Sequence, residues 1–579
     1  MSGTSNISPF ELEIIKNGLI VAAEEMFYSW GRTAKSPVIY EVLDYGVAII
    51  DASGEKQVTQ APGIPGFVGV LDFAAKEVVA KWKDEIHPGD VFISNIPYES
   101  GTHLNDVTLV MPIVEPHHNQ RLGFAVAKGH WIEVGGMHFG SWTSDSTEIY
   151  QEGLQLPCVK LYIAGEPDQN VIDIISYNSR LPDFVLGDMY AQVASMRVAA
   201  RRVIKLVEKY GLDTVLHAML KLQEDGAKYA KLKLKELPKG TFTAEDWIDD
   251  DGITDDPIFV NVEVQVTDEE FIVDFTGSGK QTKGSINSSY PGTVSAVRET
   301  YMALMDPQTH PSGGFFSPLK VIAPKGSIFN PERPAPTSTF WESLSYAADL
   351  VWKALAPHAP HMLTAGHFLS IEATILGGVD DKGEPFAIVE PQPGGWGAGF
   401  DMDGTSGLVA VGDGETYIAS TEVYERRMPI MVDQYSLNTK DRTGHGMFRG
   451  GFGVIRDYRV LCSEANLTVT AGRSKYPCWG VAGGMPGTPN YAVIHTKDEK
   501  RRIRRIAAFK MMKGDVVSLR TGGGGGWGDA LSRDPERVRW DVKNEYISLE
   551  DAQNIYGVVI DPNTLEIDWE RTQELRERK

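Results

Sequence analysis

Glycine clusters beside tryptophan and phenylalanine limit the folds open to this chain. It has 59 glycines among 579 residues, and after residue 377 many stand in runs such as Gly394-Gly395-Trp396-Gly397 and residues 522–526, which precede Trp527. A flexible linker would combine glycine with serine and would lack tryptophan. Runs that adjoin aromatic residues instead indicate turns with positive φ or backbones that approach one another closely. We therefore predict a tightly packed, β-rich C-terminal half.

The hydrophobic and charged residues are typical of a folded protein with two to four domains of about 150 residues each. Hydrophobic residues make up 42% of the chain and aromatic residues 9%, which provides material for buried cores and excludes disorder for most of the chain. The 56 lysines and arginines against 78 acidic residues give a net charge of −22. Nucleic acids and anionic membranes are bound by clustered lysine and arginine. We therefore expect a small-molecule substrate, with no nucleic acid and no membrane as partner.

Periodic patterns divide the chain into three parts of an α/β (α+β) fold. The first helix is expected to begin at Ser8-Pro9, where a cap precedes a proline. Further helices are expected over residues 66–82, 186–210, 293–305 and 344–355, and from residue 535 onward. Strands are expected over residues 45–51, 91–93, 122–127, 241–248, 258–266 and 270–275, and over most of 376–520.

The composition changes near residue 236, where a lysine-rich helix ends. We expect a mixed N-terminal α/β domain over residues 1–235, which holds the candidate metal site described below. A central, mixed β-rich domain is expected over 236–465. A glycine-rich β segment with a charged helical tail is expected over 466–579.

The cysteines and the N-terminus favour a cytoplasmic protein. Cys158, Cys462 and Cys478 are too few and too widely spaced for a disulfide framework or a structural zinc site. Residues 1–9 lack the basic and apolar regions of a signal peptide, and no run of about 18 apolar residues occurs.

Histidines and a carboxylate gather where two predicted strands end. His103 and Asp106 follow the strand at 91–93, and His130 follows the strand at 122–127. Two imidazoles and a carboxylate at strand ends suit a divalent metal such as Zn, Mn or Fe. Because no cysteine takes part, the set favours an open, catalytic site over a structural zinc.

Other residues nearby extend this candidate site. Either Glu41 or Asp44 supplies an acidic fourth ligand from upstream, and His138 follows closely enough to approach the same cavity. A surface or supporting position is the simpler interpretation of His138. The alternative for the whole set is that its members are loop residues that cap one another, with His130 buried beside Trp131.

The sequence lacks the common nucleotide-binding and nucleophile motifs. The chain has no G-x-x-x-x-G-K-[ST] motif, and residues 522–526 are not followed by lysine and a long apolar helix. No G-x-S-x-G motif occurs, and the sequence around Cys158 is typical of a small core residue. If ATP is used, we expect it to bind elsewhere.

Short motifs in a fixed order cover nearly the whole chain and identify a family. They are Gly101-Thr102-His103-Leu104-Asn105-Asp106-Val107, residues 130–136, Gly140-Ser141, Glu152-Gly153-Leu154, Asp274-Phe275-Thr276-Gly277-Ser278, Arg449-Gly450-Gly451, residues 522–529 and Asp534-Pro535-Glu536. Together they resemble the hydantoinase B / oxoprolinase family. That family includes the B subunits of ATP-dependent N-methylhydantoinases and lactamases, the C-terminal half of 5-oxoprolinase, and a subunit of ATP-dependent acetone and acetophenone carboxylases.

The resemblance implies a division of labour between two chains. A hydantoinase A-type ATPase subunit would use ATP and Mg to phosphorylate the substrate, and the B-type chain would hold a divalent metal (Zn, Mn or Fe) and make or break the bond. A further small subunit is implied in the carboxylase case. This arrangement would explain the missing nucleotide motif.

The resemblance also assigns the metal ligands residue by residue. His103 and Asp106 match the family's T-H-x-x-D-V motif, His130 matches the first histidine of H-H-x-D-I-G-G, and Asp44 falls where the family has an acidic residue, with Glu41 as its neighbour. The metal ligands implied are therefore Asp44, His103, Asp106 and His130.

This sequence departs from the family pattern beside those ligands. The second histidine of the motif is Trp131, its aspartate is Glu133, and the family's N-D-P-Y contains Ile96. Glu133 and His138 are the residues expected in catalysis, with Glu133 as a proton acceptor or as an orienter of a ligand histidine. The departures reshape the pocket and leave the ligands intact.

Three functions follow as expectations. The first is hydrolysis of a cyclic amide, such as a hydantoin, oxoproline or a lactam, in a two-component ATP-dependent enzyme. The second is a subunit of a ketone carboxylase that joins an enolate to CO2 or bicarbonate. The third is a scaffolding subunit that has lost catalysis, which the replacements at Ile96 and Trp131 motivate.

Overall fold

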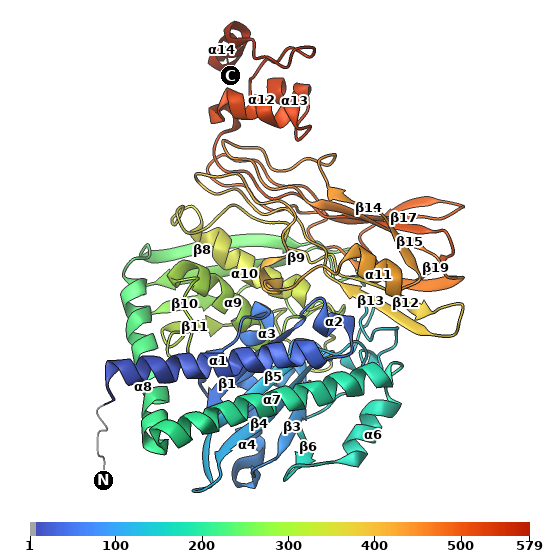
Figure 1. The fold of residues 1–579 in the computed structure, drawn as a ribbon. Helices are drawn as coiled ribbons and strands as arrows, with labels where there is room; N and C mark the ends of the chain where they lie inside the picture. The colour runs from blue at the N-terminus through green and yellow to red at the C-terminus, as the bar shows by residue number, and fades with distance from the viewer. Residues whose placement is uncertain (1–6, 579) are drawn as a thin grey trace.

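The structure is a computed structural model that describes residues 7–578 and arranges them in four sheets. Helices flank the first two sheets, and strands and extended segments dominate the second half of the chain (Figure 1). The expected α/β fold with a β-rich C-terminal half is confirmed.

The first sheet is antiparallel and has the strand order β2-β1-β5-β4-β3-β6-β7. Its strands are β1 (Tyr45–Asp51), β2 (Gln57–Gln60), β3 (Val91–Ser94), β4 (Asp106–Glu115), β5 (Gln120–His130), β6 (Val159–Ile163) and β7 (Glu166–Pro167). The central strands β4 and β5 are buried along nearly their whole length, because helices cover both faces of the sheet.

Long helices cover one face of this sheet. They are α1 (Pro9–Thr33), α7 (Pro182–Tyr210) and α8 (Leu212–Leu234), and α1 and α7 lie side by side in Figure 1. The helix α1 begins as expected: Ser8 accepts from the backbone of Glu11, and the Glu11 side chain accepts from the backbone of Ser8. Short helices connect these elements: α2 (Pro37–Tyr40), α5 (Pro97–Ser100) and α6 (Gln169–Tyr177).

The other face is covered by a helix that is shorter than the sequence predicts. Residues 66–82 were expected to form one helix, but the chain forms α3 (Pro65–Val68) and α4 (Leu71–Trp82), with a break at Gly69. A Cβ on Gly69 would lie 2.1 Å from the hydroxyl oxygen of Ser295, so a distant segment packs closely against this position. Packing against that segment therefore ends the first helix.

The second sheet has the order β11-β10-β9-β8 and packs against two buried helices. Its elements are β8 (Gly240–Ile248), β9 (Ile258–Val266), β10 (Phe271–Asp274), α9 (Tyr290–Met305), β11 (Leu319–Ile322) and α10 (Trp341–Leu355). The expected strands at 241–248 and 258–266 and the helices at 293–305 and 344–355 are confirmed within one to three residues at their ends. One hydrophobic core runs from the first sheet into this region.

Two further sheets enclose a separate hydrophobic core. One consists of β12 (Thr374–Val379), β13 (Pro385–Glu390), β16 (Glu464–Thr470) and β19 (Arg505–Met512). The other consists of β14 (Ile430–Leu437), β15 (Val454–Val460), β17 (Tyr491–His495), β18 (Lys500–Ile503) and β20 (Val516–Arg520), and α11 (Thr421–Arg427) lies beside it. The expected domain boundary after residue 465 falls inside β16, which pairs with β12 and β19. The expected boundary after residue 235 lies between α8 and β8.

The glycine runs form extended segments that bond to several neighbours at once. Gly524 donates to the carbonyl of Gly451 and accepts from the amide of Gly444, and a Cβ on Gly524 would lie 2.0 Å from the carbonyl oxygen of Trp396. Only glycine leaves room for backbones this close together. The predicted close backbone packing is therefore confirmed, in irregular segments between the sheets and the C-terminal helices (Figure 1).

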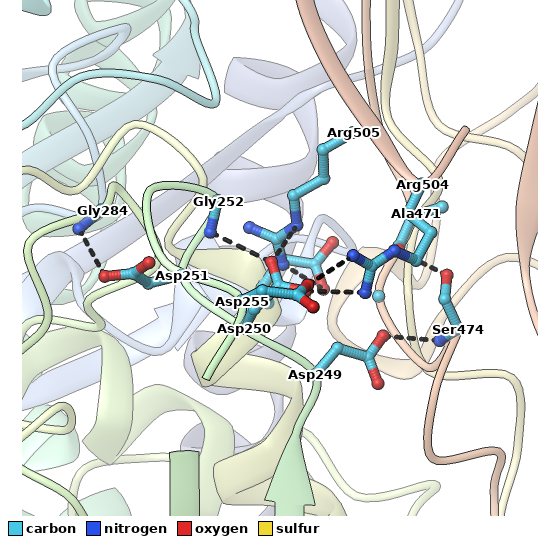
Figure 2. Close-up of polar contacts among 12 residues, drawn as sticks. Asp249, Asp250, Asp251, Gly252, Asp255, Gly284, Ala471, Ser474, Arg504 and Arg505 are labelled. Carbon is cyan, nitrogen blue, oxygen red and sulfur yellow. Dashed lines mark hydrogen bonds and ion pairs between the residues drawn. The ribbon is translucent and has the colours of Figure 1, made fainter. Parts of the chain in front are cut away.

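An acidic loop joins the second sheet to the C-terminal region. Asp249 accepts from the amides of Ser474, Lys475 and Tyr476 at 2.6, 3.0 and 3.1 Å, which places three backbone donors on one carboxylate. Asp250 pairs with Arg504 at 2.8 Å (Figure 2). We call residues 249–255, with the partners just named, the interdomain clamp.

The C-terminal helices form a small unit with its own core. They are α12 (Pro535–Lys543), α13 (Leu549–Asn554) and α14 (Trp569–Arg578), and they lie at one end of the molecule, beyond the glycine segments (Figure 1). The expected helical tail is confirmed. Within residues 7–578, every helix is too short or too polar to cross a membrane.

Candidate metal centre

Strand pairing brings the three central candidates together. Asp106 is the first residue of β4 and His130 is the last residue of β5, and the two residues are direct partners in the antiparallel pair. His103 lies in the tight loop that leads into β4, where the amide of Asp106 donates to the carbonyl of His103. The sheet therefore places these three side chains together at one end of two neighbouring strands.

The ligand atoms of these residues lie close together. His103 Nε2 is 2.9 Å from Asp106 Oδ1 and 3.2 Å from His130 Nδ1, and His130 Nδ1 is 3.4 Å from Asp106 Oδ1. All three side chains are buried, and their ligand atoms lie within 4.8 Å of one another. This is the geometry expected of residues that share one metal ion.

Asp44 extends the group toward solvent. Its carboxylate lies 3.9 Å from His130 Nδ1, and its side chain is 21% exposed, whereas that of Asp106 is fully buried. Of the two upstream candidates, Asp44 is the one whose carboxylate approaches His130. Glu41 contributes instead to the electrostatic environment of Tyr424.

Hydrogen bonds from the surrounding chain orient two of these residues. His103 Nδ1 lies 3.1 Å from the carbonyl oxygen of Ser338 and donates its proton to that oxygen, which leaves Nε2 directed at Asp106 Oδ1. The Thr102 hydroxyl donates to the other oxygen of Asp106. Two imidazole nitrogens and a carboxylate oxygen therefore converge, and a divalent cation, which would displace a proton from those nitrogens, fits this ligand set.

Burial and neighbouring charges shift the pKa values of several groups at this site. Burial acts to raise the pKa of Asp106, but the adjacent His103 and His130 outweigh it and hold that pKa below its usual range. Burial raises the pKa of Asp44 to about 8, and the nearby carboxylates of Asp413 and Asp106 add to the rise. Burial also lowers the pKa of Lys128, whose Nζ donates to the backbone carbonyl of Asp106, to about 8.

A second layer of contacts fixes the ligand His103. Glu152 accepts from the amides of Thr337 and Ser338 and from the hydroxyl of Ser146, which orients the Ser338 carbonyl toward His103. Burial raises the pKa of Glu152 to about 7, against the lowering effect of these donors.

Aromatic rings pack against the same histidine. The ring centroids of Phe340 and Trp341, at the start of α10, lie 5.2 and 5.7 Å from that of His103, and Trp142 packs on Trp341. These rings are buried and limit the access of water to this side of the site.

The two residues expected in catalysis engage other partners. Glu133 is fully buried and accepts from the amides of Gly135 and Gly140 and from Arg180. His138 Nε2 lies 3.0 Å from Asp145. Neither residue belongs to the group whose ligand atoms meet, and their contacts show them holding the loop that follows β5.

Several groups at the site were not found from the sequence. Ser338, Asp413 and Glu299 come from segments far from residues 103–130 along the chain, whereas Glu152 belongs to a quoted family motif but was given no role. One sequence feature could have indicated Glu299, which is an acidic residue in a helix whose other residues are mostly buried. No sequence feature indicates Asp413, because a Gly-Asp-Gly sequence is typical of an ordinary turn.

Comparisons with known proteins agree on one family. A model of the family described as Hydantoinase B/oxoprolinase matches residues 8–530. A protein from Pseudomonas sp. (strain NS671), named as the B subunit of a putative D-/L-hydantoinase, is 31% identical over 597 residues, which cover 98% of this chain and 98% of that one.

Solved structures share the fold over the whole chain. The crystal structure of ATP-dependent caprolactamase from Pseudomonas jessenii is 27% identical, with a TM-score of 0.90, and the match covers 99% of this chain and 100% of that one. The nucleotide-free structure of acetone carboxylase gives a TM-score of 0.91 at 18% identity, covering 99% of this chain and 83% of that one. The latter likeness concerns the fold alone.

Proposed function

Because the chain belongs to the hydantoinase B/oxoprolinase family, we propose that it is the metal-containing subunit of a two-component, ATP-dependent enzyme that hydrolyses a cyclic amide. The observation that carries the proposal is the convergence of His103 Nε2, His130 Nδ1 and Asp106 Oδ1 at one end of β4 and β5. Asp44 would complete a set of two nitrogen and two carboxylate ligands.

The choice of a cyclic amide rests on the whole-length relatives. The relatives that are 27–31% identical carry the names hydantoinase and caprolactamase, whereas the carboxylase is 18% identical. The hydantoinase relative is named as a B subunit and a 29% identical caprolactamase relative as a beta subunit, which supports a partner chain. We infer that this partner is an A-type ATPase that activates the substrate by phosphorylation.

The chain's own residues hold and orient the reacting groups. A divalent metal bound at the site supplies Lewis acidity, which favours attack of water on an acyl carbon. His103 is fixed in the ligating tautomer by the Ser338 carbonyl, and Thr102 fixes the carboxylate plane of Asp106. The rings of Phe340 and Trp341 cover one side of His103, and Asp44 is the partly exposed member of the group, so we infer that the substrate approaches from the Asp44 side.

Glu133 and His138 have a supporting part in this proposal. Their partners are loop amides, Arg180 and Asp145, so they hold the segment between β5 and the aromatic residue Trp142. A direct part in proton transfer would require these contacts to break.

The test is an assay of the reconstituted complex of this chain with an A-type ATPase partner. Hydantoin, 5-oxoproline and caprolactam are compared with acetone and acetophenone plus bicarbonate, and ADP and product are measured. We expect ADP release with a ring-opened product and no requirement for bicarbonate. Bicarbonate-dependent ADP release with a ketone would make the chain a carboxylase subunit. Unchanged activity after His103→Ala, with no bound metal, would leave only a scaffolding role.

A further inference from the structure

Two carboxylates beside the metal centre, the buried one of Glu299 and the half-buried one of Asp413, have no role in holding the metal ligands. Glu299 lies on α9, and both of its carboxylate oxygens are buried without a hydrogen-bond partner among the described residues. Asp413 ends a short turn, η3 (Val411–Asp413), that belongs to the second half of the chain. We call Asp413 and Glu299 the acidic wall.

The segment that carries Asp413 packs directly on the site. The amide of Tyr417 donates to the carbonyl of Val42 at 3.0 Å, two residues before Asp44. A Cβ on Gly412 would lie 3.2 Å from a methyl group of Leu344 and 3.8 Å from Glu299 Oε1. The turn is therefore held between the Asp44 segment, α10 and Glu299.

The acidic wall and the metal ligands are close enough to interact electrostatically. The charge of Asp413 acts on both Asp44 and Glu299, and the charge of Asp106 acts on Asp413. The wall thus lies on the Asp44 side of the centre, which is the side that reaches solvent. A substrate bound at the metal would extend toward these carboxylates.

The chemistry of the wall selects what it can bind. A buried hydrogen-bond acceptor without a donor raises the free energy of the folded chain, and a ligand that supplies a donor removes this unfavourable contribution. The neighbours named above contribute carboxylates, methyl groups and backbone but no cationic side chain. The wall would repel an anion and would attract an N–H group or an ammonium ion.

We propose that Asp413 and Glu299 form an amine subsite, which binds the N–H edge of a cyclic amide and the amino group that its hydrolysis releases. This inference rests on the proposed function. Hydrolysis breaks the ring C–N bond, adds the hydroxyl of water to the acyl carbon and adds its hydrogen to nitrogen. For a lactam or 5-oxoproline the product carries a carboxylate and an amine, and for a hydantoin it carries a carboxylate and a carbamoyl N–H group. The product of ketone carboxylation carries neither nitrogen group. The carboxylate end then faces the metal centre, and the amine end faces the acidic wall.

The test measures binding to the metal-loaded chain by calorimetry. The probes are 4-aminobutyrate, 5-aminopentanoate and 6-aminohexanoate, each paired with the fatty acid of the same length that lacks the amino group. We expect at least one amino acid to bind about tenfold or more tightly than its fatty acid, a preference worth about 1.4 kcal/mol. Glu299→Gln and Asp413→Asn should each reduce the preference to about twofold or less.

The control is Glu415→Gln, which changes an exposed acid on the same loop. It should retain the full preference, and metal content should stay equal in all four proteins. Two results would overturn the inference: an equal affinity for amino and non-amino probes at every length, or a second metal ion per chain that both wall variants lose. If the complex opens no cyclic amide while the amine preference persists, then the proposed function fails and the subsite stands.

Discussion

The metal centre and the interdomain clamp are both rich in buried carboxylates, and they differ in what surrounds those carboxylates. In the clamp, Asp249 accepts from three backbone amides and Asp250 pairs with Arg504 (Figure 2). In the metal centre, Asp106 faces the imidazoles of His103 and His130, and Asp44 lies beside other acids. Buried acids that face backbone amides and arginine stabilise a fold, whereas acids that face imidazoles and one another form a set of possible metal ligands.

The difference shows how acidic sequence should be interpreted. The run Asp249-Asp250-Asp251 looks more like a cation site than the dispersed residues of the metal centre do. The structure satisfies each carboxylate of that run from within the chain: Asp251, for example, accepts from the amides of Gly284 and Thr254. The number of acids in a cluster therefore predicts less than the kind of group that faces them.

The largest effect should come from removing a ligand at the metal centre. His103→Ala takes away one of two nitrogen ligands, so bound metal should fall from about one ion per chain to less than about 0.1, and ATP-dependent activity of the complex should fall by about 10³-fold or more. Metal analysis and steady-state kinetics measure both. Asp255→Asn is the matched control because Asp255 is a largely exposed clamp residue. Full metal content in His103→Ala would contradict the assignment.

Removing an acid should have opposite effects on stability in the two regions. Asp249→Ala leaves three amides without their acceptor, so the free energy of unfolding should fall by about 2–5 kcal/mol. Asp44→Asn in the metal-free chain should leave that free energy unchanged or raise it at neutral pH. Burial and the nearby Asp413 and Asp106 raise the pKa of Asp44 to about 8, so the folded chain must keep a proton that the unfolded chain releases, and Asn removes this cost. Denaturant unfolding in the presence of a chelator measures both. Equal decreases in the free energy of unfolding for the two variants would contradict the proposed difference between the clamp and the metal centre.

Local patterns in the sequence predicted much of the fold and part of the site. The cap at Ser8 and the run of α7 depend on neighbouring residues, and the pair His103–Asp106 is set by four residues of one loop. The break at Gly69 depends on contact with Ser295, more than 200 residues away. No local pattern records that contact.

The same limit explains the catalytic expectations. Glu133 stands where the family motif has an aspartate, which predicted a part in catalysis, and in the structure Arg180 and the loop amides contact its carboxylate. Asp413 and Glu299 approach the site through packing between distant segments. A local motif can point to the first residue, whereas no local pattern points to the other two.

A smaller effect should appear in the pH dependence of stability. The raised pKa values of Asp44, about 8, and Asp413, about 7, mean that the folded, metal-free chain keeps protons that the unfolded chain releases above about pH 4. Unfolding then releases protons, so the free energy of unfolding should fall as pH rises from about 4 to about 8.

Comparison of the wild type with Asp44→Asn isolates this contribution. Between about pH 4 and about pH 8, in the presence of a chelator, the free energy of unfolding of the wild type should fall by about 1–4 kcal/mol more than that of the variant. Excess divalent metal should reduce the difference, because the metal takes the place of the proton. Asp255 in the clamp should give a pH dependence of stability of the opposite sign, because Lys475 and Arg504 lower its pKa to about 2. Identical pH profiles for the two proteins would contradict the account of Asp44.

The smallest effect should follow from His138→Ala. His138 contacts Asp145 at the edge of the loop, so its removal should change kcat/KM by no more than about threefold and leave the metal content intact. Steady-state kinetics of the complex with a cyclic amide measure this. A loss of about 100-fold or more in kcat, with metal still bound, would return His138 to a direct part in catalysis.

Anomalous X-ray diffraction from crystals of the metal-loaded chain tests the central claim most directly. With zinc, we expect one strong peak about 2.0–2.2 Å from His103 Nε2, His130 Nδ1 and a carboxylate oxygen of Asp106. No peak is expected at the clamp, where protein donors already satisfy the carboxylates. A site between these histidines that stays empty while the clamp or another acidic cluster binds zinc at full occupancy would contradict the account.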